Sequence, residues 1–183
     1  TYHLELEKKD GKIETKRLAH QDYLKMMAAN DIKQRVRMTQ LYYEAEKRYY
    51  IVCGTTNLPE TIQGFFVKYG DGGVDIEPLT NLYKKQVFDL GKYLGVPQEV
   101  LQRTPSPDTY SLPVSDKDFY FCMPYETLDL VMYAMLNGIP ADKTASVTGL
   151  TIEQLERAWK DFKRKRKATE TLRALPPSPE LTF

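Results

Sequence analysis

Residues 49–86 constrain the fold of this chain most strongly. Residues 49–53 are aromatic or β-branched except at the last position, which is typical of a strand buried on both faces of a parallel sheet. Gly54 ends this run, and Thr-Thr-Asn at 55–57 supplies residue types that commonly cap helices. Because Pro59 suits a first helical turn, the pattern predicts a strand that leads into a helix through a small polar turn. Ligands of α/β folds bind at such turns.

A glycine-rich stretch follows at residues 68–75, with the sequence Lys-Tyr-Gly-Asp-Gly-Gly-Val-Asp. Its glycines let the backbone approach a ligand closely or adopt positive φ angles. Two acids and one lysine surround them, so the stretch could contact a charged ligand. Taken alone, the same composition is also typical of a flexible surface loop.

Composition bounds the classes of protein that this chain can belong to. With 183 residues it can bury one sizeable core, and we expect residues 1–183 to form a single domain. The net charge of +1 gives no overall field that favours nucleic acid or membrane. Its apolar runs are too short to span a membrane. We expect a cytoplasmic protein whose Cys53 and Cys122 are buried thiols in a reducing compartment.

The remaining chain alternates between helical patterns and turns. Residues 1–18 contain an Asp-Gly pair and predict a hairpin. Residues 23–47 predict a helix, interrupted near Asn30 and Asp31. A further helix should end at Gly95, which suits the position after a helix C-terminus.

Residues 140–175 predict a helical C-terminal region. Its main helix begins with a capping box formed by Thr151 and Gln154. The run Lys-Arg-Lys-Arg-Lys at 163–167 falls near the end of that helix, where the helix dipole favours cations.

Three motifs in the central stretch resemble those of the ammonia-dependent NAD synthetases. They are Gly54-Thr55-x-Asn57-x-x-Glu60, Gly64-Phe65-Phe66-x-Lys68-Tyr69-Gly70-Asp71-Gly72 and Leu82-Tyr83-Lys84-x-Gln86. The basic Arg35-Val36-Arg37-Met38 upstream fits the same family. Order and spacing agree together, and the resemblance covers roughly residues 30–135 well.

The resemblance implies an α/β fold with a mostly parallel sheet flanked by helices, of the adenine nucleotide α-hydrolase, Rossmann-like type. It implies an ATP-dependent ligase that amidates deamido-NAD to NAD through an acyl adenylate, which ammonia attacks. Magnesium would accompany ATP, since Mg²⁺ prefers oxygen ligands and bridges carboxylates and phosphates. The family also implies a homodimer with the substrate site at its interface.

The family's binding residues transfer to seven positions of this sequence. They are Thr55, Lys84 and Ser106 for ATP, Arg35, Lys68 and Asp75 for deamido-NAD, and Glu60 for magnesium. Ser106 lies in Thr-Pro-Ser-Pro-Asp at 104–108, which resembles the family's Pro-(Thr/Ser)-Ala-Asp segment. Without the resemblance, Glu60 would be an ordinary acid at a helix N-terminus and Lys84 a solvated lysine.

Two departures from the family pattern bear on activity. The phosphate-binding loop Ser-Gly-Gly-x-Asp-Ser does not occur, so we expect the C-terminal part of a longer synthetase that is inactive, or nearly so, by itself. Thr171-Leu172 stand where relatives often carry His-Lys. No Cys-His-Glu set for glutamine hydrolysis is evident, so free ammonia is the expected nitrogen source.

Two other functions remain open. A related ATP pyrophosphatase could amidate another carboxylate, which Thr171-Leu172 favours and the intact 68–75 stretch disfavours. Residues 141–162 also resemble a helix-turn-helix followed by basic residues, which would suit nucleic acid. The near-zero net charge weighs against that second alternative.

Overall fold

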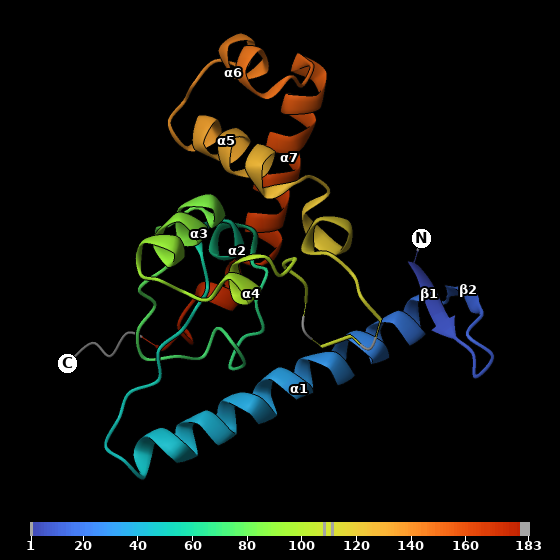
Figure 1. Cartoon of the computed structure of the whole chain (residues 1–183), viewed down its shortest axis with the longest axis vertical. Coiled ribbons are helices and arrows are strands. Elements are labelled where there is room, and N and C mark those ends of the chain that lie inside the picture. The colour runs from blue at the N-terminus through green and yellow to red at the C-terminus, as the bar shows by residue number, and fades with distance from the viewer. Residues whose placement is uncertain (1, 108, 111, 180–183) are drawn as a thin grey trace.

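The computed structural model describes residues 2–107, 109–110 and 112–179 (Figure 1). A two-stranded sheet, β1 (Tyr2–Glu7) and β2 (Ile13–Leu18), precedes the helices. These are α1 (His20–Glu46), α2 (Leu58–Gln63), α3 (Lys84–Tyr93), α4 (Gln98–Leu101), the π-helix η1 (Lys117–Phe121), α5 (Tyr125–Leu136), α6 (Ala141–Thr148), α7 (Ile152–Ala168) and α8 (Glu170–Arg173).

The hairpin and α1 form the N-terminal part of the molecule. Strands β1 and β2 pair antiparallel, with Tyr2 opposite Leu18, and the turn between them places Gly11 at a φ of +79°. Helix α1 runs along one side of the molecule, with the hairpin beside its N-terminal end (Figure 1). The predicted interruption near Asn30 and Asp31 is wrong. These residues lower helix propensity only modestly, and the helix continues through them.

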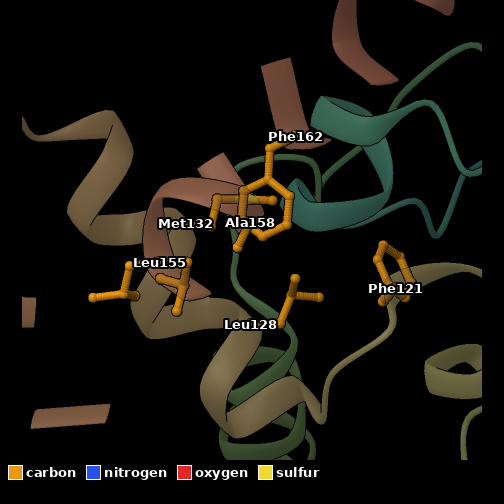
Figure 2. Packing of buried hydrophobic residues seen from close by; sticks show 7 residues of the cluster. Phe121, Leu128, Met132, Leu155, Ala158 and Phe162 are labelled. Carbon is orange, nitrogen blue, oxygen red and sulfur yellow. The ribbon is translucent and has the colours of Figure 1, made fainter. Parts of the chain in front are cut away.

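The main core lies between η1, α5 and α7. Its buried side chains are Phe121, Leu128, Val131, Met132, Leu155, Ala158 and Phe162, most of which Figure 2 labels. The Trp159 indole N–H donates to the carbonyl of Val131 at 2.9 Å, which fixes α7 against α5. The capping box that begins α7 at Thr151 and Gln154 is present as predicted.

Parallel pairing is limited, in the described ranges, to one bridge between Cys53 and Ile76. The prediction that residues 49–53 form a strand buried on both faces is wrong. Tyr49 is 99% exposed with a φ of +56°, and only Val52 of this run is buried. In the described residues this run pairs only with the segment around Ile76, so it lacks the sheet whose flanking helices would bury both of its faces.

Short helices with strong caps carry the central stretch. Asn57 caps α2 through a reciprocal capping box with Glu60, and Gly64 ends α2 in the left-handed conformation at a φ of +73°. A Cβ atom at Gly64 would lie only 2.2 Å from the Thr169 hydroxyl. The prediction that Gly95 follows the end of α3 is confirmed, with a φ of +74°.

Both cysteines are free but exposed, so the prediction of buried thiols is wrong. Cys53 lies in the bridge to Ile76, and its side chain is exposed there. Cys122 adopts a left-handed conformation that closes η1 and turns its side chain outward. Among the described helices, none is both long and apolar enough to cross a membrane.

Candidate functional site

The N-termini of α2 and α3 bring Glu60 and Lys84 together. The Lys84 ammonium lies 3.1 Å from one Glu60 carboxylate oxygen, and the side chains are 18% and 15% exposed. The other Glu60 oxygen accepts from the Asn57 backbone N–H at 3.0 Å. Because Leu58 also donates to the Leu82 carbonyl at 2.9 Å, the starts of the two helices are fastened together.

The side chains of Tyr125 and Asp116 adjoin this ion pair. The Lys84 ammonium lies 5.1 Å from the centre of the Tyr125 ring, a cation–π contact. The Tyr125 hydroxyl donates to Asp116 Oδ2 at 2.8 Å. Burial raises the pKa of Asp116 above its ordinary value, and nearby Lys84 partly offsets this effect. Burial and the negative charge of Asp116 likewise raise the pKa of Tyr125.

Asp129, which lies on α5, fixes the start of α3. Its Oδ2 accepts from the Lys85 backbone N–H at 2.8 Å, which satisfies a donor that the first helical turn would leave unpaired. Burial raises the pKa of this carboxyl. Lys84 therefore projects from a helix end that a buried acid anchors.

The sequence did not single out Asp116, Tyr125 or Asp129. Asp116 lies in an irregular segment rich in proline and serine, and Tyr125 and Asp129 lie on a helix that reads as core. No local pattern relates them to Lys84, because the contacts form only when α3, η1 and α5 pack together.

A second group contains Arg35, Lys68 and Asp75. Asp75 accepts from the Val52 backbone N–H at 2.7 Å and from the Tyr42 hydroxyl at 3.0 Å. Arg35 Nε donates to the carbonyl of Lys68 at 3.2 Å. These contacts join α1 to the glycine-rich stretch at 68–75 along a seam. The three residues that the resemblance assigns to deamido-NAD all lie on this seam.

The glycine-rich stretch is packed rather than loose. A Cβ atom at Gly72 would lie 2.3 Å from the Phe66 ring, and one at Gly70 would lie 2.9 Å from Gln34. The Asp71 carboxylate accepts from the Val67 N–H at 2.8 Å, and burial raises its pKa. The glycines are therefore required for close packing.

Lys68 connects this seam to the C-terminal region. Its ammonium donates to the carbonyls of Thr171 at 2.6 Å and Ala174 at 3.1 Å. Lys68, which the resemblance assigns to substrate binding, thus contacts the backbone of Thr171, at the position where relatives often carry His-Lys.

Thr55 and Ser106 are both exposed. Thr55 lies in the turn between the Cys53 bridge and α2, two residues before the cap at Asn57. Ser106 follows Pro105, whose carbonyl accepts from the Asp116 backbone N–H at 3.1 Å. Asp108, from the same sequence motif, lies outside the described residues.

The residues present fit a magnesium ion held partly by substrate. No group of three or more potential metal-binding side chains occurs in the described part of the chain. Glu60 offers a carboxylate of which one oxygen pairs with the Lys84 ammonium. Mg²⁺ commonly takes one or two protein carboxylates and completes its shell with phosphate oxygens and water.

The basic run at 163–167 is partly engaged in internal contacts. The Lys165 ammonium donates to the Tyr120 carbonyl at 2.7 Å and lies 2.9 Å from Asp161. Arg164 also pairs with Asp161, at 2.6 Å. These contacts reduce the positive charge available to a polyanion.

A model of the NAD synthase family matches residues 4–169. The chain is 46% identical over 167 residues to an NH(3)-dependent NAD(+) synthetase of Mesorhizobium japonicum, covering 91% of this chain and 52% of the relative. It is 47% identical over 112 residues to that of Thermotoga maritima, covering 61% of this chain and 39% of the relative.

This chain belongs to the NAD synthase family. It spans about half the length of the curated relatives from Mesorhizobium japonicum and Rhizobium rhizogenes.

Solved structures agree. An NMN synthetase of Francisella tularensis superposes with a TM-score of 0.67 at 29% identity, covering 88% of this chain and 63% of the other. An NAD+ synthetase of Burkholderia pseudomallei gives 0.51 at 31% identity, covering 80% and 48%. These likenesses confirm the predicted α/β class of the adenine nucleotide α-hydrolase type.

Proposed function

We propose that this chain takes part in the ATP-dependent amidation of deamido-NAD to NAD. The substrate carboxylate attacks the α-phosphorus of ATP and displaces pyrophosphate, which gives an acyl adenylate. Ammonia then attacks the carbonyl carbon and loses a proton to water, and AMP leaves with the bonding electrons. The Glu60–Lys84 pair at two converging helix N-termini supports this function most directly.

Glu60 and Lys84 are suited to a shared role in binding the triphosphate. Glu60 would hold Mg²⁺ through the carboxylate oxygen that pairs with Lys84 here, and the Lys84 ammonium would bind phosphate oxygens of ATP. The metal supplies charge neutralisation of the phosphate oxygens. The exposed hydroxyls of Thr55 and Ser106 complete the set proposed for ATP.

The seam on α1 is the proposed site for deamido-NAD. Arg35 and Lys68 carry positive charges suited to pyrophosphate and carboxylate groups, and Asp75 can accept from ribose or amide donors. Large apolar side chains such as Ile32 and Val36 remain exposed on α1. We propose that a second copy of the protein covers them in a homodimer, with the substrate site at the interface and the enzyme in the cytoplasm.

A related amidation is the second candidate. The Francisella tularensis neighbour is an NMN synthetase, and it superposes with a higher TM-score than the Burkholderia pseudomallei enzyme. The substrate could therefore be a mononucleotide that carries the same carboxylate. The common chemistry at Glu60 and Lys84 would be unchanged.

A chimera tests this proposal. This chain replaces the matching 167-residue segment of the Mesorhizobium japonicum synthetase, and NAD formation is followed with ATP, Mg²⁺, ammonium and deamido-NAD. We expect product formation, and a loss of roughly 100-fold or more in Glu60→Gln, the scale of losing a group that stabilises charge in the transition state.

Two outcomes separate the candidates. Turnover of nicotinic acid mononucleotide but not deamido-NAD favours the second one. A folded chimera that binds ATP yet amidates neither nucleotide contradicts both.

A further inference from the structure

Asp116 is a buried acid with an incomplete set of hydrogen bonds. Its side chain is 3% exposed, and Oδ2 is bonded to the Tyr125 hydroxyl. Oδ1 is buried without a hydrogen-bond partner among the described residues. An unsatisfied buried carboxylate oxygen destabilises the fold, so an apolar residue or a fully bonded amide would serve packing better.

The local backbone around Asp116 is also unusual. The π-helix η1 begins directly after it, and Cys122 closes that helix at a φ of +61°. Short π-helical turns are rare and occur frequently at functional sites. The Asp116 N–H is held by the carbonyl of Pro105 at 3.1 Å, so the acid is fixed at both backbone and side chain.

Tyr125 links Asp116 to the ion pair. Its hydroxyl binds the acid, while its ring lies against the Lys84 ammonium at 5.1 Å from the centroid. A carboxylate that accepts the phenol hydrogen bond polarises the ring and makes its face more attractive to a cation. Lys84, whose four-carbon side chain is flexible, is thereby held by Glu60 on one side and by Tyr125 on the other.

We propose that Asp116 is a positioning residue, which acts through Tyr125 to hold Lys84 where it meets the triphosphate. The proposal rests on the proposed function of Lys84. With Glu60 engaged by a metal ion, the Tyr125 ring would be the contact that still orients the ammonium. Asp116 then aims a cation that would otherwise sample many rotamers.

A spectroscopic signature tests the arrangement independently of catalysis. In the chain labelled with ¹³C-lysine, the Tyr125 ring current should shift the ε-methylene resonance of Lys84 upfield. We expect Tyr125→Leu to abolish the shift and Asp116→Asn to reduce it. Asp118→Asn is the matched control, because that exposed acid lies in η1 and bonds Ser115 instead.

Kinetics in the chimera test the consequence for catalysis. We expect Asp116→Asn to lower kcat/KM for ATP by roughly 10–100-fold, as removal of a partner that orients a binding group does. The KM for deamido-NAD should stay unchanged, and Asp118→Asn should match the unmodified chimera. A purely structural role would instead alter thermal stability and both substrates' kinetics together.

The two arms separate the possible failures. A folded chimera that binds ATP but amidates neither nucleotide refutes the proposed function, and the lysine signal still reports on Asp116. If folded Asp116→Asn keeps both the Lys84 shift and the affinity for ATP, Asp116 does not position Lys84. Tyr125→Phe keeps the ring and loses the hydroxyl. Its Lys84 shift and its kcat/KM for ATP should fall between those of Tyr125→Leu and those of Asp116→Asn.

Discussion

The α5–α7 region and the α1 region are held together by different forces. The former buries large apolar side chains in one continuous core (Figure 2). Around α1, buried apolar residues are few, namely Met38, Ala45 and Val52, and polar contacts from Arg35 and Asp75 fasten the helix. The contrast indicates that the α5–α7 region is rigid, whereas the geometry of the seam on α1 depends on a few hydrogen bonds.

The largest expected effect on stability is in the α5–α7 region. Phe162→Ala removes a buried ring from α7 and should lower the free energy of unfolding by about 3–5 kcal/mol. Chemical denaturation measures this change, with Val147→Ala on exposed α6 as the control. If both variants lost similar amounts, the contrast between core and surface would fail.

The next largest effect is expected where the end of α2 meets the end of α7. Gly64→Ala introduces both an unfavourable φ and a clash with Thr169 and should destabilise by about 2–3 kcal/mol. Gly95→Ala is the matched control, because its φ is similar but the space beside it is open, so only about 1–2 kcal/mol should be lost. Equal losses in denaturation would show that Thr169 yields without strain.

Smaller effects should arise at the seam. Tyr42→Phe removes the hydrogen bond to Asp75 and should lower stability by about 0.5–1.5 kcal/mol. Hydrogen exchange should speed up in α1 and stay unchanged in α7. Faster exchange in both helices would mean that α1 and the α5–α7 region unfold as one unit.

The pH dependence of stability should show the smallest effect. Burial raises the pKa of Asp116, so its contribution to stability is complete below the ordinary aspartate pKa and is lost as the pH rises through the higher folded-state pKa. Asp116→Asn should therefore gain stability over the unchanged chain as the pH rises from about 4 to 7. Parallel denaturation curves across this range would contradict the sign.

Local sequence signals predicted local structure well. Asn57 and Thr151 cap α2 and α7 because capping depends only on residues three positions apart. Gly95 ends α3 for the same kind of local reason.

Features that depend on distant residues escaped prediction. The run at 49–53 has the composition of a buried strand, but pairing partners, not composition, decide whether it forms one. Two contacts join separate elements of the fold. One links Asp116 to Tyr125, and the other links Lys68 to the Thr171 carbonyl. The motif residues Glu60 and Lys84 were found through the family resemblance, and the structure shows that they form an ion pair.

Lys84→Gln in the chimera tests whether Lys84 binds the triphosphate, with Lys85→Gln as the neighbouring control. Lys84 pairs with Glu60 at the site, whereas Lys85 extends into solvent and pairs with Asp89. We expect Lys84→Gln to lower kcat/KM for ATP by roughly 100-fold or more and Lys85→Gln to change it little. Equal losses in the two variants, or full activity in Lys84→Gln, would contradict the assignment of the triphosphate site to the Glu60–Lys84 pair.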